Sequence, residues 1–185
     1  MIVTTRTTDQ MTVPQRKPVP RRGVVMLELI LALPLLIIVV MAIVEFGLLF
    51  SNEQVVAMAS RAGTQVASEL TTIPSAGAVP VTVETAVARE LARIGVTRYR
   101  IRLEHNADFT PPPLTMTAVV LTTTSAGGPT GGAAPSAITL TPDRRYVRVT
   151  VYVWTTDLTP NLLSTFCVDL SNRVSSQTTL RRHVG

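Results

Sequence analysis

One long apolar segment dominates the hydrophobic pattern near the start of the chain. Between residues 24 and 50 only Glu28 and Glu45 carry a charge. A helix over this segment is about 40 Å long, whereas the hydrocarbon core of a bilayer is about 30 Å thick. Both carboxylates fall near the ends of the segment, where they cost far less than the roughly 3 kcal/mol expected at the centre of the bilayer. The pattern therefore predicts a transmembrane helix over 24–50, bent or locally loosened at Pro34.

The pattern after this segment predicts that the helix continues over residues 51–70. Apolar positions recur there at spacings of three and four and form one stripe, made of Val55, Ala59, Ala62, Val66 and Leu70. The stripe is rich in alanine, so it suits the close approach of another helix. It equally suits the covering of a sheet from the same chain, and the sequence leaves both interpretations open.

Periodic segments farther along predict a second helix and several strands. The helix is expected to have Thr82 as its cap, to end at Gly95 and to bury Val83, Val87, Leu91 and Ile94. Alternation of apolar and polar residues predicts strands at 98–104, 116–124, 146–154 and 166–180, with a turn or short helical segment at 155–165.

Helices followed by strands indicate an α+β fold with a small antiparallel sheet. The expected organisation is a leader at 1–23, the transmembrane helix at 24–50 and an exported domain at 51–185. Residues rich in proline, glycine and alanine predict flexible loops near 105–115 and 125–137.

Charge is concentrated at the N-terminus. Five of the 17 basic residues, but only one carboxylate, lie in residues 1–23, while the residues just after the apolar segment carry no arginine or lysine up to Ser60. This asymmetry predicts a cytoplasmic N-terminus and an extracytoplasmic C-terminal part. From residue 24 onward acids and arginines nearly balance, and no aromatic platform accompanies the charge, so nucleic-acid binding is not expected. In the strand at 98–104, Arg98, Arg100 and Arg102 share one face. It is interpreted as a solvated sheet face rather than a site for a phosphate or an acidic partner.

No catalytic, cofactor or metal site is predicted, and an enzymatic role is not expected. The two histidines, His105 and His183, and the single cysteine, Cys167, have no metal-ligand spacing. Asp108 and Asp143 are too few ligands for calcium. Cys167 is interpreted as a buried thiol in a strand, with an intermolecular disulfide as the alternative.

The start of the apolar segment resembles the processing site of type IV prepilins. Basic residues precede Gly23, four residues follow it, and Glu28 then opens the hydrophobic helix. The resemblance implies cleavage between Gly23 and Val24 by a prepilin peptidase on the cytoplasmic face. Glycine before the cut has a physical reason, because a side chain there would obstruct entry into a narrow catalytic cleft.

The wider segment is similar to TadE-like proteins, which are minor pilins or pseudopilins of the tight-adherence (Flp-type IV) pilus. The residues that carry this similarity are Arg22-Gly23, Glu28, Leu33-Pro34-Leu35 and Glu45-Phe46-Gly47. The similarity implies a role in pilus assembly and surface adhesion, in the inner membrane or in the pilus itself. It implies other pilins and an inner-membrane assembly platform as partners. Leu29, where major pilins carry tyrosine, and the length of the chain both favour a minor component.

Glu28 is the first of the residues expected to act in assembly, together with Pro34, Glu45, Phe46 and Gly47. Cleavage would leave a positive amine on Val24, and Glu28 of a neighbouring subunit, offset by about 6 Å along the helix axis, could pair with it. The alternative is that Glu28 lies among lipid headgroups without a partner. At the level of function, the alternative is an uncut single-pass membrane protein whose exported domain binds an envelope component.

Overall fold

The computed structural model describes residues 22–106, 118–136, 145–166 and 173–184. By internal contacts the chain divides into residues 1–37 and residues 38–185. In the first unit the described residues are helical, and every described side chain from Val25 to Ile37 is exposed. These residues belong to α1, which spans Arg22–Glu69 and continues through Pro34.

The second unit is built on a four-stranded antiparallel sheet. Its strands are β1 (Tyr99–His105), β2 (Val119–Thr124), β3 (Tyr146–Trp154) and β4 (Val174–Arg182), and their spatial order is β2-β1-β3-β4. The pairing of β1 with β3 places Tyr99 opposite Val153, and the pairing of β3 with β4 places Trp154 opposite Val174. The α+β class with a small antiparallel sheet, predicted from the sequence, is confirmed.

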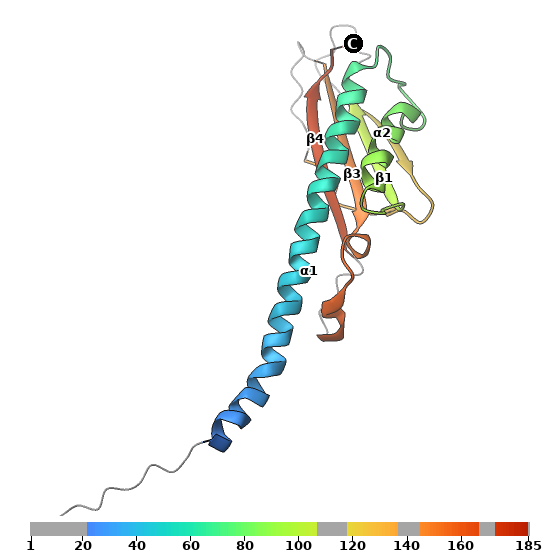
Figure 1. The fold of residues 1–185 in the computed structure, drawn as a ribbon. Helices are drawn as coiled ribbons and strands as arrows, with labels where there is room; N and C mark the ends of the chain where they lie inside the picture. The colour runs from blue at the N-terminus through green and yellow to red at the C-terminus, as the bar shows by residue number, and fades with distance from the viewer. Residues whose placement is uncertain (1–21, 107–117, 137–144, 167–172, 185) are drawn as a thin grey trace, which may run out of the picture. The chain divides into compact units, whose positions relative to one another are not determined.

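The C-terminal part of α1 and the short helix α2 (Val81–Ala92) pack on one face of this sheet (Figure 1). The apolar core lies between them. It combines Val56, Val83, Val87 and Leu91 of the helices with Ile101, Leu103, Val149, Val151 and Val153 of the strands. Alternating apolar side chains of β1 and β3 fill this face because successive side chains of a strand point to opposite sides.

The second helix begins one residue before the predicted cap. Pro80 is the N-cap, no side-chain cap hydrogen bond forms, and Thr82 lies inside the helix. Proline suits the entry to a helix because its φ is fixed near the helical value and the missing N–H has no intrahelical acceptor there. The predicted inner residues Val83, Val87 and Leu91 are buried, while Ile94 packs on the core from a partly buried position.

The buried stripe of α1 differs from the predicted one by about one residue. Val55, Ala62, Val66 and Leu70 are only partly buried, and the buried residues are Val56, Ala59, Ser60, Gly63, Thr64, Ala67 and Ser68. The hydroxyl of Ser60 donates to the carbonyl of Val149 at 2.9 Å, and a Cβ on Gly63 would lie 2.6 Å from Cγ2 of Val87. Small polar residues occupy this face because they let the helix approach the sheet and α2 closely. Residues 51–69 of the helix therefore cover the sheet of their own chain.

The opposite face of the sheet is covered by residues 125–136, the segment expected to be a flexible loop. The hydroxyl of Tyr152 donates to the carbonyl of Ala133 at 3.2 Å, and the indole of Trp154 donates to the carbonyl of Gly127 at 3.1 Å. A Cβ on Gly132 would lie 2.6 Å from the Tyr152 ring. The segment thus packs closely on β3, and its mobility stays a prediction.

Several strand boundaries differ from the predicted ones: β1 is shifted by one residue from 98–104, and β4 ends at Arg182 rather than at residue 180. The last strand was expected from residue 166, but Leu162–Phe166 is a short 3-10 helix, η2, and β4 begins at Val174. A second 3-10 helix, η1, spans Thr155–Asp157, so the short helical segment predicted at 155–165 is confirmed. Described residues of the second strand begin at 118, and β2 begins at Val119. The expectations for Asp108, Asp143 and Cys167 fall outside the described residues.

Candidate functional site

The candidate processing site lies in the first two turns of α1. Gly23 is exposed, and a Cβ added there would meet no atom within 4 Å. The first four N–H groups of a helix have no intrahelical acceptor, and glycine lowers helix stability by about 1 kcal/mol relative to alanine. The bond between Gly23 and Val24 therefore lies where α1 unwinds most easily, as a peptidase that binds an extended chain requires.

Glu28 lies one turn beyond this bond and is exposed. Within the part of the chain that the structure describes, its carboxylate forms no hydrogen bond or ion pair. Neighbouring Leu27, Leu29 and Leu31 are each at least 60% exposed. The carboxylate is thus presented on an apolar helix surface, where pairing with a cation of another molecule is open to it.

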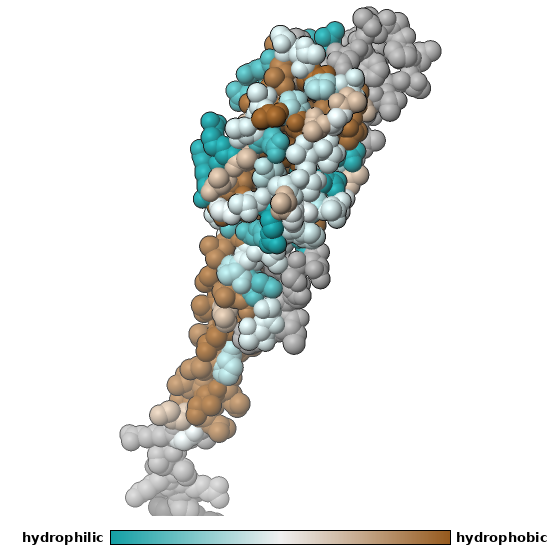
Figure 2. Space-filling view, turned by 90° about the vertical axis from the view of Figure 1, so that its right-hand side faces the viewer, coloured by the Kyte–Doolittle hydropathy of each residue, from teal (hydrophilic) through white to brown (hydrophobic). Residues whose placement is uncertain are grey.

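The N-terminal half of α1 has the properties of a membrane span. The helix from Val25 onward contains a strongly apolar stretch, long enough to cross a membrane, that is not buried inside the protein. Figure 2 shows apolar side chains gathered over this half of the helix. Large side chains exposed there include Leu31, Leu35, Leu36 and Ile43. Exposure of so much apolar surface in water is unfavourable, so the surface requires a lipid or protein environment.

Glu45 differs from Glu28 because it is fully buried. The hydroxyl of Thr159, in the connection between β3 and β4, donates to Oε1 of Glu45 at 3.4 Å. About two turns farther along α1, the amide of Asn52 donates to the carbonyl of Leu158 at 2.6 Å. The β3–β4 connection is therefore fixed to α1 at two heights. No sequence pattern predicted these contacts, since Glu45 and Thr159, for example, are separated by 114 residues.

Phe46 and Gly47, which adjoin Glu45, lie on the exposed side of α1. Phe46 is 44% exposed, and a Cβ on Gly47 would meet no atom within 4 Å. Pro34 is also exposed. The three residues of the motif Glu45-Phe46-Gly47 thus have different environments: the acid faces the protein's own domain, whereas the aromatic ring and the glycine remain accessible.

The arginines at positions 98, 100 and 102, of which the first precedes β1 and the others lie in it, are engaged within the domain. Arg98 pairs with Asp157, which raises the pKa of the Arg98 guanidinium above its usual range. Arg100 lies 4.7 Å from the centre of the Tyr152 ring, and Arg102 pairs with Glu104 at 2.6 Å. A binding site for a phosphate is therefore not supported by this row.

Glu104 also pairs with the buried Arg148, whose Nη1 donates to the carbonyl of Ser136 at 2.6 Å. Burial of charges is expensive unless they are paired and hydrogen-bonded. The pair therefore serves the packing of residues 125–136 on the sheet.

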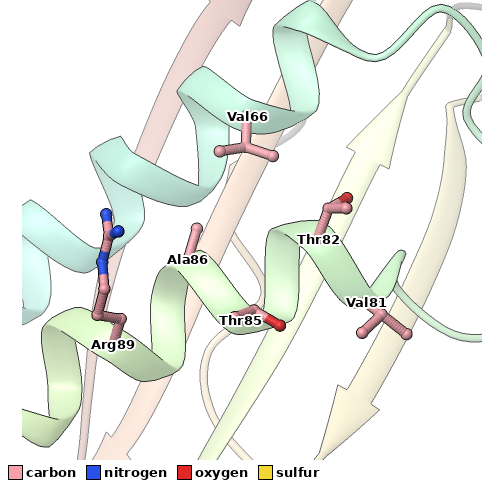
Figure 3. A pocket seen from close by; sticks show the side chains of 6 residues that line it. All are labelled: Val66, Val81, Thr82, Thr85, Ala86 and Arg89. Carbon is pink, nitrogen blue, oxygen red and sulfur yellow. The ribbon is translucent and has the colours of Figure 1, made fainter.

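A pocket of about 420 Å³ opens between α1 and α2 (Figure 3). Its lining consists of Val66, Val81, Thr82, Thr85, Ala86 and Arg89. Among these described lining residues, the only ionisable group is the Arg89 guanidinium. Among residues 22–106, 118–136, 145–166 and 173–184, no three histidine, cysteine or acidic side chains are grouped as a metal site. Neither feature supports a catalytic reaction.

The comparisons with known proteins concern the same helix. The family model described as TadE-like protein matches residues 23–65. This range begins at the proposed cleavage site and lies wholly within α1. The resemblance inferred from Arg22-Gly23, Glu28 and the later motifs is thereby confirmed, and it associates the chain with the tight-adherence pilus and its membrane. No curated protein and no solved structure matches the chain.

Proposed function

From the TadE-like match over residues 23–65, we propose that the protein is a minor pilin or pseudopilin that takes part in assembly of a tight-adherence type IV pilus. The observation that carries the proposal is the coincidence of this match with a helix whose first half is apolar and exposed. A helix of this kind can hold the protein in the inner membrane and can pack with similar helices in a fibre. The exported domain then caps, primes or decorates that fibre.

In this proposal the newly made protein inserts with its N-terminus in the cytoplasm, because the arginines and the lysine of residues 1–23 keep that end on the cytoplasmic side. A prepilin peptidase cuts after Gly23 and frees the amine of Val24. Other pilins and the inner-membrane assembly platform are the partners of the mature chain. An enzymatic activity and nucleic-acid binding are not part of this proposal.

Glu28 has a specific task in this proposal. A freed amine and a carboxylate in a low-dielectric environment attract each other strongly, and each is costly when left alone. Glu28 of one subunit therefore pairs with the Val24 amine of the next and sets the axial register of the two helices. Its exposure, with no partner in the described part of its own chain, supports this role.

Intact-mass measurement of the protein from its native membranes tests the proposal. A chain that begins at Val24, and a full-length chain in cells whose prepilin peptidase is inactive, are the expected results. Gly23→Leu should block cleavage in peptidase-competent cells, whereas Gly47→Leu, a matched change in the same helix, should leave it intact.

The second candidate is an uncut single-pass protein whose exported domain binds an envelope component. The pocket between α1 and α2 is the observation that favours it. Retention of residues 1–23, together with the absence of pilus components from the purified material, would replace the pilin proposal with this one.

A further inference from the structure

One end of the exported domain carries two hydrogen bonds between α1 and the β3–β4 connection. At this end β3 finishes, β1 and β4 begin, and the β3–β4 connection, described over Thr155–Phe166, runs beside α1 past the sheet (Figure 1). We call this end the base of the domain. The connection is fixed at the base by the bonds of Thr159 to Glu45 and of Asn52 to Leu158.

The contacts at Glu45 mark a reference position along the axis of α1. Below it, residues 24–44 contain Glu28 as their only charged residue, and at 1.5 Å per residue they measure about 31 Å. This length equals the roughly 30 Å of a hydrocarbon core. Above it, the described domain covers one side of α1 almost continuously, because Leu49, Val56, Ala59 and Ser60 are partly or fully buried. The predicted span of 24–50 is longer than the bilayer needs.

Among the described residues at the base, the charges that reach solvent are those of arginines. Arg93 and Arg98 have side chains that are 64% and 48% exposed, and Arg173 is exposed as well. The acids are withdrawn: the side chains of Glu90 and Asp157, which pair with Arg93 and Arg98, are only 10% and 12% exposed. Glu45 is fully buried, and the half-buried Glu53 accepts a hydrogen bond from Ser175.

We propose that the base of the domain rests on an anionic lipid surface, with the outer boundary of the hydrocarbon core at Glu45. The β3–β4 connection then lies in the headgroup layer, and Arg93, Arg98 and Arg173 attract the lipid phosphates. Burial of Glu45 against Thr159 keeps its carboxylate out of the lipid at this boundary. Phe46 and Phe50 lie in the interfacial layer, where aromatic rings are favoured. This proposal shares one premise with the proposed function, namely that the apolar half of α1 lies in a membrane.

A spin-label scan along the exposed side of α1 tests the position of the boundary. Single cysteines replace Val40, Ile43, Gly47, Phe50 and Gln54, which are all exposed and follow one face of the helix, in a full-length Cys167→Ser background. The protein is reconstituted in vesicles of phosphatidylethanolamine and phosphatidylglycerol, and the accessibility of each label to oxygen and to a nickel chelate is measured. Labels at 40 and 43 should be lipid-like, and the profile should turn toward water from 47 onward. Labels at 47 and 50 as lipid-like as the label at 43 would overturn the proposal.

A fluorescence measurement tests the contact with headgroups. A bimane on Ser164→Cys, in the exposed part of the connection, should be quenched by a headgroup nitroxide at least twofold more strongly than a bimane on Thr85→Cys of α2. Equal quenching at the two positions contradicts the proposal. Arg93→Gln with Arg173→Gln should reduce the quenching at Ser164 at least twofold, as should vesicles that lack phosphatidylglycerol.

A matched pair of exposed arginines provides the control. Arg145→Gln with Arg182→Gln alters the opposite end of the sheet, where β3 begins and β4 ends, and should leave the quenching unchanged. Equal losses from the two pairs would contradict a specific contact at the base. Because none of these readouts requires pilus assembly, failure of the pilin proposal would leave them interpretable.

Discussion

At the scale of single residues, the two acids of the apolar segment have opposite environments. Glu28 is exposed on the helix surface, whereas Glu45 is buried against Thr159. Both positions were recognised from the sequence because a carboxylate in an apolar helix is exceptional. Only the folded domain distinguishes them, since the residues that cover Glu45 follow it by more than a hundred positions.

The exposed carboxylate gives the first prediction. Glu28→Ala should remove the partner of the Val24 amine and reduce incorporation of the protein into sheared pili at least tenfold. Glu69→Ala, which removes an exposed acid at the other end of α1, is the control and should incorporate normally. Quantitative immunoblots of pili measure both, and normal incorporation of Glu28→Ala would refute the pairing role.

Two glycines of α1 give a second prediction. Gly63 lies against Val87 and Val149, whereas Gly47 faces open space. Gly63→Leu should therefore lower the free energy of unfolding by about 1–3 kcal/mol through overpacking. Gly47→Ala should raise it by up to about 1 kcal/mol through helix propensity. Urea denaturation of the full chain in detergent measures the two changes, and similar effects at both glycines would contradict the described packing.

Tyr99 gives a prediction on pH. Burial, and then the nearby Glu84 carboxylate, raise the pKa of the Tyr99 phenol above its ordinary value of 10.0. The folded chain thus holds this proton more tightly than the unfolded chain. The resulting stability is present below pH 10 and is lost as the pH rises through 10 toward the folded pKa. Unfolding of the wild type between pH 9 and pH 11 should show a steeper loss than that of Tyr99→Phe, and equal slopes would contradict this environment.

At the scale of elements, alternation of residue types predicted the sheet better than it predicted the helix faces. The strand over residues 146–154 was predicted with its observed bounds, because Val147, Val149, Val151 and Val153 alternate with larger or polar residues. The final strand is largely polar, so its start at Val174 could not be read from apolar spacing.

The buried face of α1 was predicted only in part, for a related reason. Its buried side includes Ser60 and Thr64, whose hydroxyls bond to carbonyls, and an apolar stripe cannot reveal them. Among the candidate site residues, Gly23, Glu28 and the Glu45 motif could be proposed from the sequence because they form local patterns. The partner of Glu45 was not, because its contact is formed only by the tertiary fold.

The sheet provides the fourth prediction. Arg148, whose side chain is 9% exposed, pairs with Glu104 under residues 125–136. Glu104→Gln should lower the free energy of unfolding by about 3–5 kcal/mol, because it leaves a buried guanidinium without a compensating charge. Glu69→Gln, at an exposed position, should change it by less than about 0.5 kcal/mol. Chemical denaturation compares the two variants, and a small effect of Glu104→Gln would show that Arg148 finds compensation elsewhere.

At the scale of the whole molecule, one helix is assigned two tasks. Its apolar half suits lipid and other helices, and its C-terminal half is built into the core of the α+β domain. The TadE-like match covers both halves and ends before the sheet. The proposed membrane anchor and assembly element is therefore one continuous part of the chain, joined to its domain by buried contacts from Glu45 onward.

Site-specific photocrosslinking from Leu31 tests this account most directly. Leu31 is 71% exposed and lies in the apolar half of α1, one turn beyond Glu28. A photoreactive residue at this position, in cells that assemble the pilus, should form adducts with the N-terminal helix of another pilin. Glu28→Ala should abolish those adducts. Adducts with lipid alone, in cells that carry assembled pili, would contradict the claim that this helix serves assembly as well as anchoring.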